Sequence, residues 1–258
     1  AVDARDVTRV YIFPIAEVKY SLFNDIFIPY IGARGGVKQT TFKSLTGDNE
    51  FLLPNVELRN ENTAYDFYGG IKGTISRRIS FNAAISFAKV KDKALFVTDT
   101  IHSPRNKFNV IYDTMTVATI EGSISYQLME KLKIDAIGKF YSYTALNNSY
   151  AWNLPRLEIT LRGSYNLFDK FIFNLDVKME EGRKALVYAP GTGISEENGQ
   201  YYQKLNFIAD VNLGVEYRYN KRISAFVQFN NIAAQQYMRW HNTPVQGFQF
   251  LGGVTYRF

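Results

Sequence analysis

The side chains best suited to catalysis in this sequence lie around its two histidines. His102 has Asp99 three residues before it and Ser103 directly after it, and His241 lies in a separate polar segment. An acid, a histidine and a hydroxyl group are the parts of a nucleophilic or acid–base site. A hydrolase built on a barrel would need these groups on a strand edge or at an outer rim, whereas both histidines fall in polar connections. We expect solvated loop histidines, and no enzyme.

Metal and cofactor sites lack their usual ligands. The chain has no cysteine, and its two histidines are far apart in the sequence, so we expect no strong transition-metal site. Gly191-Thr-Gly193 lacks the strand–loop–helix context of a phosphate-binding loop and is interpreted as a turn. The sequence therefore predicts no catalytic residue, no metal and no cofactor.

Charged side chains of both signs recur at alternate positions of extended segments. Successive side chains of a strand point to opposite faces, so these charges share one face of a sheet. Opposite charges on adjacent strands can pair, which favours a self-neutralised polar wall. The alternative is a water-filled or plugged passage whose lining meets a solute or a plug. The positions concerned are Glu17, Lys19, Asp66, Lys72, Asp135, Lys139, Glu158, Arg162, Asp176, Lys178, Asp210, Glu216, Arg218 and Arg257.

Eleven strands are predicted to position these side chains. In the clearest of them, apolar residues alternate with polar ones over at least the 9–11 residues that a tilted strand needs to cross a bilayer. A tenth strand follows a turn at 220–221. The other ten are expected at 8–23, 27–42, 62–76, 79–97, 108–129, 132–146, 156–167, 171–180, 205–219 and 247–258.

The composition excludes a membrane-spanning helix without favouring a soluble protein. No stretch approaches the roughly 18 consecutive uncharged apolar residues that such a helix needs. The strands of a membrane barrel contain no such stretch, because only alternate residues of each strand contact lipid. Aromatic residues make up 16% of the chain, an excess that fits interfacial girdles. The net charge of +6 is scattered, so nucleic-acid binding is not expected.

Short and long connections alternate along the chain, as in outer-membrane barrels with short periplasmic turns and long extracellular loops. The segments at 43–61 and 184–203 read as long loops, and we expect ligand or partner contacts there. A soluble all-β sandwich or barrel is the alternative, but it would have shorter strands and one buried face. The predicted fold class is therefore all-β: one antiparallel transmembrane barrel domain over residues 1–258.

The final segment, 247–258, is the clearest example of the pattern. Phe248, Phe250, Val254, Tyr256 and Phe258 fall on one face, and polar or small residues fall on the other. An apolar face opposite a polar one, closed by a terminal aromatic residue, fits a strand between lipid and a polar lumen.

The last thirty residues resemble the end of TonB-dependent outer-membrane receptors. That family's penultimate strand carries an Asn-aliphatic pair followed by Tyr. Its last strand opens with Pro-x-x-Gly and ends with Gly-x-x-aromatic-x-Phe. The matching positions here are Asn231, Ile232, Tyr237, Pro244, Gly247, Gly253, Tyr256 and Phe258.

The resemblance implies an outer-membrane location in a Gram-negative bacterium, with Tyr256 and Phe258 as the signal read by the barrel assembly machinery. Trp240 with Tyr237 is expected to mark the outer aromatic girdle, in contact with outer-membrane lipid, and a sugar-stacking site is the alternative. The chain departs from the family pattern at Ala234 and Phe248, and it contains neither a plug domain nor a TonB box. Eleven strands would be half of a twenty-two-stranded family barrel.

Two functions follow from this resemblance. The first is uptake of an unidentified solute, with the plug and coupling segment upstream of this chain. The second is a non-transporting barrel that serves as a structural or accessory subunit of an envelope protein complex. Bacterial single-chain barrels have even strand numbers, so an odd count of eleven predicts that this chain is the C-terminal part of a larger barrel, unless one strand is miscounted.

Overall fold

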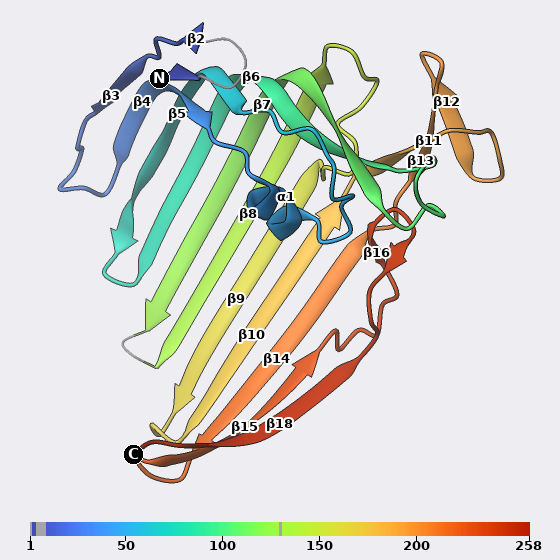
Figure 1. The fold of residues 1–258 in the computed structure, drawn as a ribbon. Helices are drawn as coiled ribbons and strands as arrows, with labels where there is room; N and C mark the ends of the chain where they lie inside the picture. The colour runs from blue at the N-terminus through green and yellow to red at the C-terminus, as the bar shows by residue number, and fades with distance from the viewer. Residues whose placement is uncertain (1, 4–8, 129–130) are drawn as a thin grey trace.

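The computed structural model describes residues 2–3, 9–128 and 131–258. Its main feature is one sheet of eleven antiparallel strands, in which each strand lies beside its neighbour in the chain (Figure 1). The eleven strands predicted from the sequence are confirmed in number. The sheet curves but does not close. Its members are β3 (Ile15–Lys19), β4 (Ile28–Lys38), β5 (Glu61–Ser76), β6 (Ile79–Thr98), β7 (Phe108–Leu128), β8 (Leu132–Ala145), β9 (Leu157–Leu167), β10 (Phe171–Glu181), β14 (Ile208–Arg218), β15 (Ile223–Asn230) and β18 (Gln249–Tyr256).

The remaining elements lie in the connections. Short turns join the strands at one end, and the long segments 39–60, 99–107, 146–156, 182–207 and 231–248 lie at the opposite end (Figure 1). We call these five segments the distal layer. The small elements are β1 (Val2–Asp3), β2 (Arg9–Val10), α1 (Phe42–Asp48), β11 (Lys184–Val187), β12 (Ile194–Glu197), β13 (Gln200–Lys204), β16 (Met238–Trp240) and β17 (Thr243–Pro244).

The first predicted strand is shorter than expected. The expected range began at residue 8, which lies outside the described residues, and only β3 joins the sheet. Pro14 has no backbone N–H to give to a ladder, so pairing begins after it. Beyond β3, Phe23, Asn24 and Asp25 adopt left-handed backbone angles and turn the chain into β4.

Two segments expected to be loops contain regular structure. In the first, Thr41 and Ser44 form a reciprocal capping box that starts α1, and Leu45 of this helix is buried. In the second, β13 pairs with both β11 and β12 to make a three-stranded sheet. No helix among the described residues combines the length and the apolar content needed to cross a membrane.

The large sheet has one apolar and one polar face near the short turns. Phe67, Ile71, Ile85, Ile120 and Ile124 all lie on the apolar face and remain 45–63% exposed. A contiguous exposed apolar surface of this kind is rare on soluble monomers and marks contact with lipid or protein. The two-faced strands expected for a membrane barrel are therefore present.

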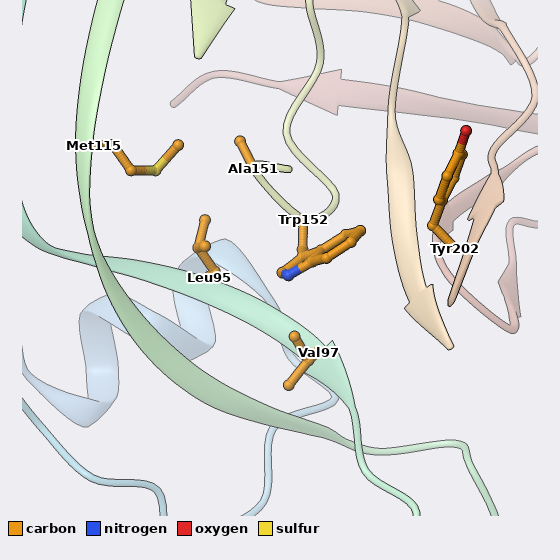
Figure 2. Close-up of a cluster of buried hydrophobic side chains, with 6 residues drawn as sticks. All are labelled: Leu95, Val97, Met115, Ala151, Trp152 and Tyr202. Atoms are coloured by element: carbon orange, nitrogen blue, oxygen red, sulfur yellow. The ribbon is translucent and has the colours of Figure 1, made fainter. Parts of the chain in front are cut away.

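The distal part of the β6–β7 hairpin is different, because it is apolar on both faces. One face carries a cluster of Leu95, Val97, Met115, Ala151, Trp152 and Tyr202 (Figure 2). The other face carries Leu45, Leu52, Phe96, Phe108 and Val110. The ladder shifts register between Val90 and Lys93, where the alternating part of β6 ends. The hairpin is thus the middle layer of a compact structure built on the strand ends.

Candidate functional site

Polar side chains form a continuous row across five strands of the polar face. Ser125, Asp135, Arg162, Asp176 and Asn212 occupy paired positions on β7, β8, β9, β10 and β14. The Ser125 hydroxyl donates to Asp135 at 2.6 Å, and Nε of Arg162 donates to Asp176 at 3.1 Å. These bonds link side chains of neighbouring strands, so the row stiffens the wall.

Ion pairs occur over much of the same face. They join adjacent strands or successive positions of one strand, so that both signs of charge are balanced locally. This agrees with the expected self-neutralised wall. The pairs are Arg34–Asp66 at 2.8 Å, Lys93–Glu61 at 3.0 Å, Lys133–Asp135 at 3.2 Å, Lys139–Glu121 at 3.3 Å, Arg162–Asp176 at 3.1 Å, Lys178–Glu180 at 2.6 Å and Arg218–Glu216 at 3.1 Å.

A cavity of about 390 Å³ lies where this wall meets the distal layer. Residues of α1 line one side of it, Trp240 provides an aromatic wall, and charged groups of both signs line the rest. A second cavity of about 540 Å³ shares Gly47, Asp48, Arg239 and Trp240 with the first. The charged lining of the first is Lys38, Asp48, Glu61, Lys93, Glu158, Lys178, Glu180 and Arg239.

Arg183 holds the hairpin that carries Arg239 and Trp240. Its guanidinium is buried and donates to the carbonyl oxygens of Met238, Arg239 and Asn206 at 2.6–3.0 Å. Burial lowers the pKa of Arg183, although the charge of Glu180 opposes this shift. This role could not be predicted from the sequence, since nothing in an Arg that follows a Gly after a strand distinguishes a buried anchor from a solvated loop cation.

Asn231 and Tyr237 tie the segment 231–248 to the polar face. The Asn231 side chain makes hydrogen bonds with the backbone of Gln235 and Gln246. The backbone N–H of Asn231 donates to the side-chain oxygen of Asn212 at 3.0 Å. The Tyr237 hydroxyl donates to Asp210 at 3.1 Å. Burial, together with the nearby Asp210 carboxylate, raises the pKa of Tyr237 to about 12.

Tyr237 and Trp240, the two residues predicted to mark the outer girdle, both pack against other parts of the chain. Tyr237 is only 8% exposed and reaches Asp210 on the polar face. The Trp240 ring packs edge-on against Phe96, with centroids 5.0 Å apart, and also contacts Phe108. Tyr237 is therefore buried and Trp240 half-buried, because the 231–248 segment folds back over the strand ends.

The other motif positions are spread along the last strand. Pro244 pairs with Met238 in the β16–β17 hairpin, and Gly247 lies in open space. A Cβ at Gly253 would come within 2.7 Å of the Phe226 ring, so this glycine gives the ring room on the polar face. Tyr256 and Phe258 are exposed and pack edge-to-face, with centroids 5.1 Å apart.

The two histidines have different partners, and His241 is not the solvated side chain that was expected. Nδ1 of His102 is 3.4 Å from Asp99, and the Ser103 hydroxyl donates to the backbone of Asp99 instead of to the imidazole. His241 is buried, with Nδ1 2.8 Å from the Thr98 hydroxyl and Nε2 3.0 Å from Gln203. Within the described parts of the chain, no group of three or more His, Asp or Glu side chains is arranged to hold a metal ion.

Comparison with solved structures gives the fold a wider context. The chain superposes on the pyoverdine outer membrane receptor FpvA of Pseudomonas aeruginosa PAO1 with a TM-score of 0.67 and 14% identity, over 95% of this chain and 36% of that one. The ferric-catecholate import receptor Fiu of E. coli K12 gives 0.63 and 13%, over 95% and 34%. The siderophore receptor PiuA of Acinetobacter baumannii gives 0.62 and 12%, over 94% and 35%.

This chain has the barrel fold of outer-membrane receptors. It spans about a third of the length of each of these three receptors. No protein-family model and no curated protein sequence matches the chain. The receptor-barrel fold agrees with the TonB-dependent family that the last thirty residues resemble.

Proposed function

We propose that this chain is part of the transmembrane barrel of an outer-membrane receptor that takes up a solute into a Gram-negative bacterium. The observation that carries the proposal is the two-faced sheet. Its apolar face suits lipid, and its ion-paired polar face suits a water-filled interior. The receptor-barrel fold supports the same assignment. The charged and aromatic cavity beside Trp240 would meet a polar solute at the distal end.

The directions of the two edge strands limit how such a barrel can be completed. Every neighbouring pair in the eleven-stranded sheet is antiparallel, so the edge strands β3 and β18 run in the same direction. Antiparallel closure therefore needs an odd number of additional strands. A second copy of this chain in the same membrane orientation would place edge strands parallel. We propose that another segment of the same protein supplies the strands, together with the plug and the coupling segment.

Single introduced cysteines test the membrane topology, because the natural chain has none. Asn198→Cys lies in the distal layer and Asp169→Cys lies in a short turn, and both positions are exposed. In intact cells, a membrane-impermeant maleimide should label the residue at 198 and spare the one at 169, while both react after lysis. Equal labelling in intact cells would overturn the proposed orientation.

Transport is tested separately in energised cells that lack the gene. Loss of uptake of one solute, restored by the full-length protein, supports the receptor role. Unchanged uptake together with loss of a co-purifying envelope complex would favour the accessory-subunit alternative.

A further inference from the structure

The short turns carry a dense positive charge. The described residues 20–27, 77–78, 131, 168–170, 219–222 and 257–258, which we call the turn rim, contain seven Lys or Arg against two Asp or Glu in 20 residues. The distal layer has nine against six in 86 residues. The net charge is thus +5 on the small rim and +3 on a layer more than four times larger.

The cations of the turn rim are not neutralised by neighbours. Among the described residues, Arg77, Arg78, Lys170, Lys221 and Arg222 make no salt bridge, whereas Arg162, the cation of the polar row, is paired with Asp176. These five cations can therefore pair with anions outside the protein.

Backbone hydrogen bonds join successive parts of this rim. The Arg218 N–H donates to the carbonyl of Lys170 at 2.7 Å, and the Arg257 N–H donates to the carbonyl of Arg222 at 2.7 Å. These bonds place three cationic segments side by side at the C-terminal half of the rim. A surface with extended negative charge could contact all of them together.

Aromatic side chains at the same turns provide an independent observation. Phe23 and Phe168 are 72% and 82% exposed, and both have left-handed backbone angles, φ 54° and 55°. Bulky residues seldom adopt this conformation, which Asn and Gly tolerate better. Both turns thus keep an aromatic ring exposed, although the backbone angles of that residue are unfavourable.

We propose that the turn rim binds the anionic headgroup layer of a phospholipid leaflet. The Lys and Arg side chains contact lipid phosphates, while Phe23 and Phe168 insert at the boundary between headgroups and acyl chains. This inference rests on the proposed membrane-barrel function, in which the short turns face the inner leaflet. It assigns a lipid class to a surface that lies far from the solute cavity.

Vesicle insertion tests the proposal. The full-length protein is diluted from urea into vesicles of phosphatidylcholine, with or without phosphatidylglycerol, and insertion is followed by the gel mobility of unheated samples. The lipid concentration for half-maximal insertion should be lower with phosphatidylglycerol. Each cation near an anionic surface contributes about 1 kcal/mol, or roughly a fivefold change. The triple variant Lys170→Gln, Lys221→Gln, Arg222→Gln should therefore lose most of the preference.

A matched variant removes the same charge from the distal layer: Lys43→Gln, Arg105→Gln, Lys107→Gln. It should keep the preference for phosphatidylglycerol. Equal loss in both triple variants, or no loss in the turn-rim variant, would overturn the inference. Failure of the unmodified protein to insert into either vesicle would instead refute the membrane-barrel function.

Variants of Phe168 test the role of the exposed ring in the same insertion experiment. Phe168→Asn should relieve backbone strain and preserve or raise stability in detergent, yet weaken insertion into both kinds of vesicle. Phe168→Trp should retain insertion, because it keeps an interfacial ring. Unchanged insertion of the Asn variant would show that the strained ring has no role at the membrane.

Discussion

The side-chain amide of Asn231 donates a hydrogen bond to the carbonyl oxygen of Gln246, 3.1 Å away across fifteen residues of chain. The same amide group donates to and accepts from the backbone of Gln235. Asn231 has φ 49°, a left-handed angle that Asn tolerates better than most residues. One side chain therefore closes both ends of the segment that carries Tyr237 and Trp240.

Replacing Asn231 should destabilise this segment. In Asn231→Ala, the buried backbone groups lose their partners and the left-handed angle becomes unfavourable, so we expect a loss of about 2–4 kcal/mol in unfolding free energy. Asn231→Gly loses the same bonds without the backbone penalty and should be about 1 kcal/mol less damaging. Urea unfolding in detergent measures both. Equal stability of the Ala variant and the natural protein would contradict this role.

Gly253 and Gly252 differ in what an added methyl group would meet. At Gly253 a Cβ lies 2.7 Å from the Phe226 ring, whereas at Gly252 the nearest atom is 3.6 Å away. We expect Gly253→Ala to cost about 1–3 kcal/mol through overpacking and Gly252→Ala to cost less. The double variant Gly253→Ala, Phe226→Ala should recover part of the loss in the same urea assay. A larger effect at Gly252 would refute this explanation.

Sequence periodicity was sufficient where lipid and lumen alternate. In β18, Phe250 and Val254 are exposed on the apolar face as predicted, and they pair with Phe229 and Ala225 of β15. The alternation is informative because odd and even positions of a two-faced strand point to opposite faces of the sheet, and each face has a single environment. The eleven strands followed from this rule.

Periodicity failed in the distal layer. Leu95 and Phe96 are both buried, on opposite faces of the same hairpin, by segments far away in the sequence. Trp240 packs against the second of these clusters, a contact that its place in the sequence did not predict. Contacts between distant loops depend on the tertiary fold, which cannot be predicted from the spacing of apolar residues within one segment.

Asp113 is expected to position the segment that contains Trp152. Its buried carboxylate accepts bonds from the backbone N–H groups and side-chain amides of Asn147 and Asn148 at 2.8–3.2 Å. Asp113→Asn places an NH₂ group against these donors and leaves buried groups unpaired, at a cost of about 1–3 kcal/mol. The segment 146–156 should loosen and expose Trp152, which donates to Asn148.

Fluorescence reports this change, since the chain has only two tryptophans. In a Trp240→Phe background, the emission of Trp152 should shift to longer wavelength in Asp113→Asn. Ser125→Ala, which removes a bond to Asp135 on the polar face, serves as the control and should leave the emission unchanged. An unshifted spectrum in Asp113→Asn would contradict the anchoring role.

His241 should make the distal layer sensitive to acid. Burial, and to a lesser extent the charge of Arg105, lowers the pKa of His241 below its ordinary value of 6.5. The unfolded chain therefore takes up the proton more readily than the folded one. The stabilisation is fully present above about pH 6.5 and is lost as the pH falls through that value towards the lower folded pKa.

Protonation would also replace an acceptor by a donor between Thr98 and Gln203, which join β6 and β13 to His241. Amide hydrogen exchange of residues 238–244, compared at pH 7.5 and pH 5 after correction for the intrinsic exchange rate, should show easier opening at the lower pH. His241→Gln should remove most of this difference. His102→Gln changes an exposed histidine and should preserve it. If both variants keep the full difference, the acid sensitivity does not come from His241.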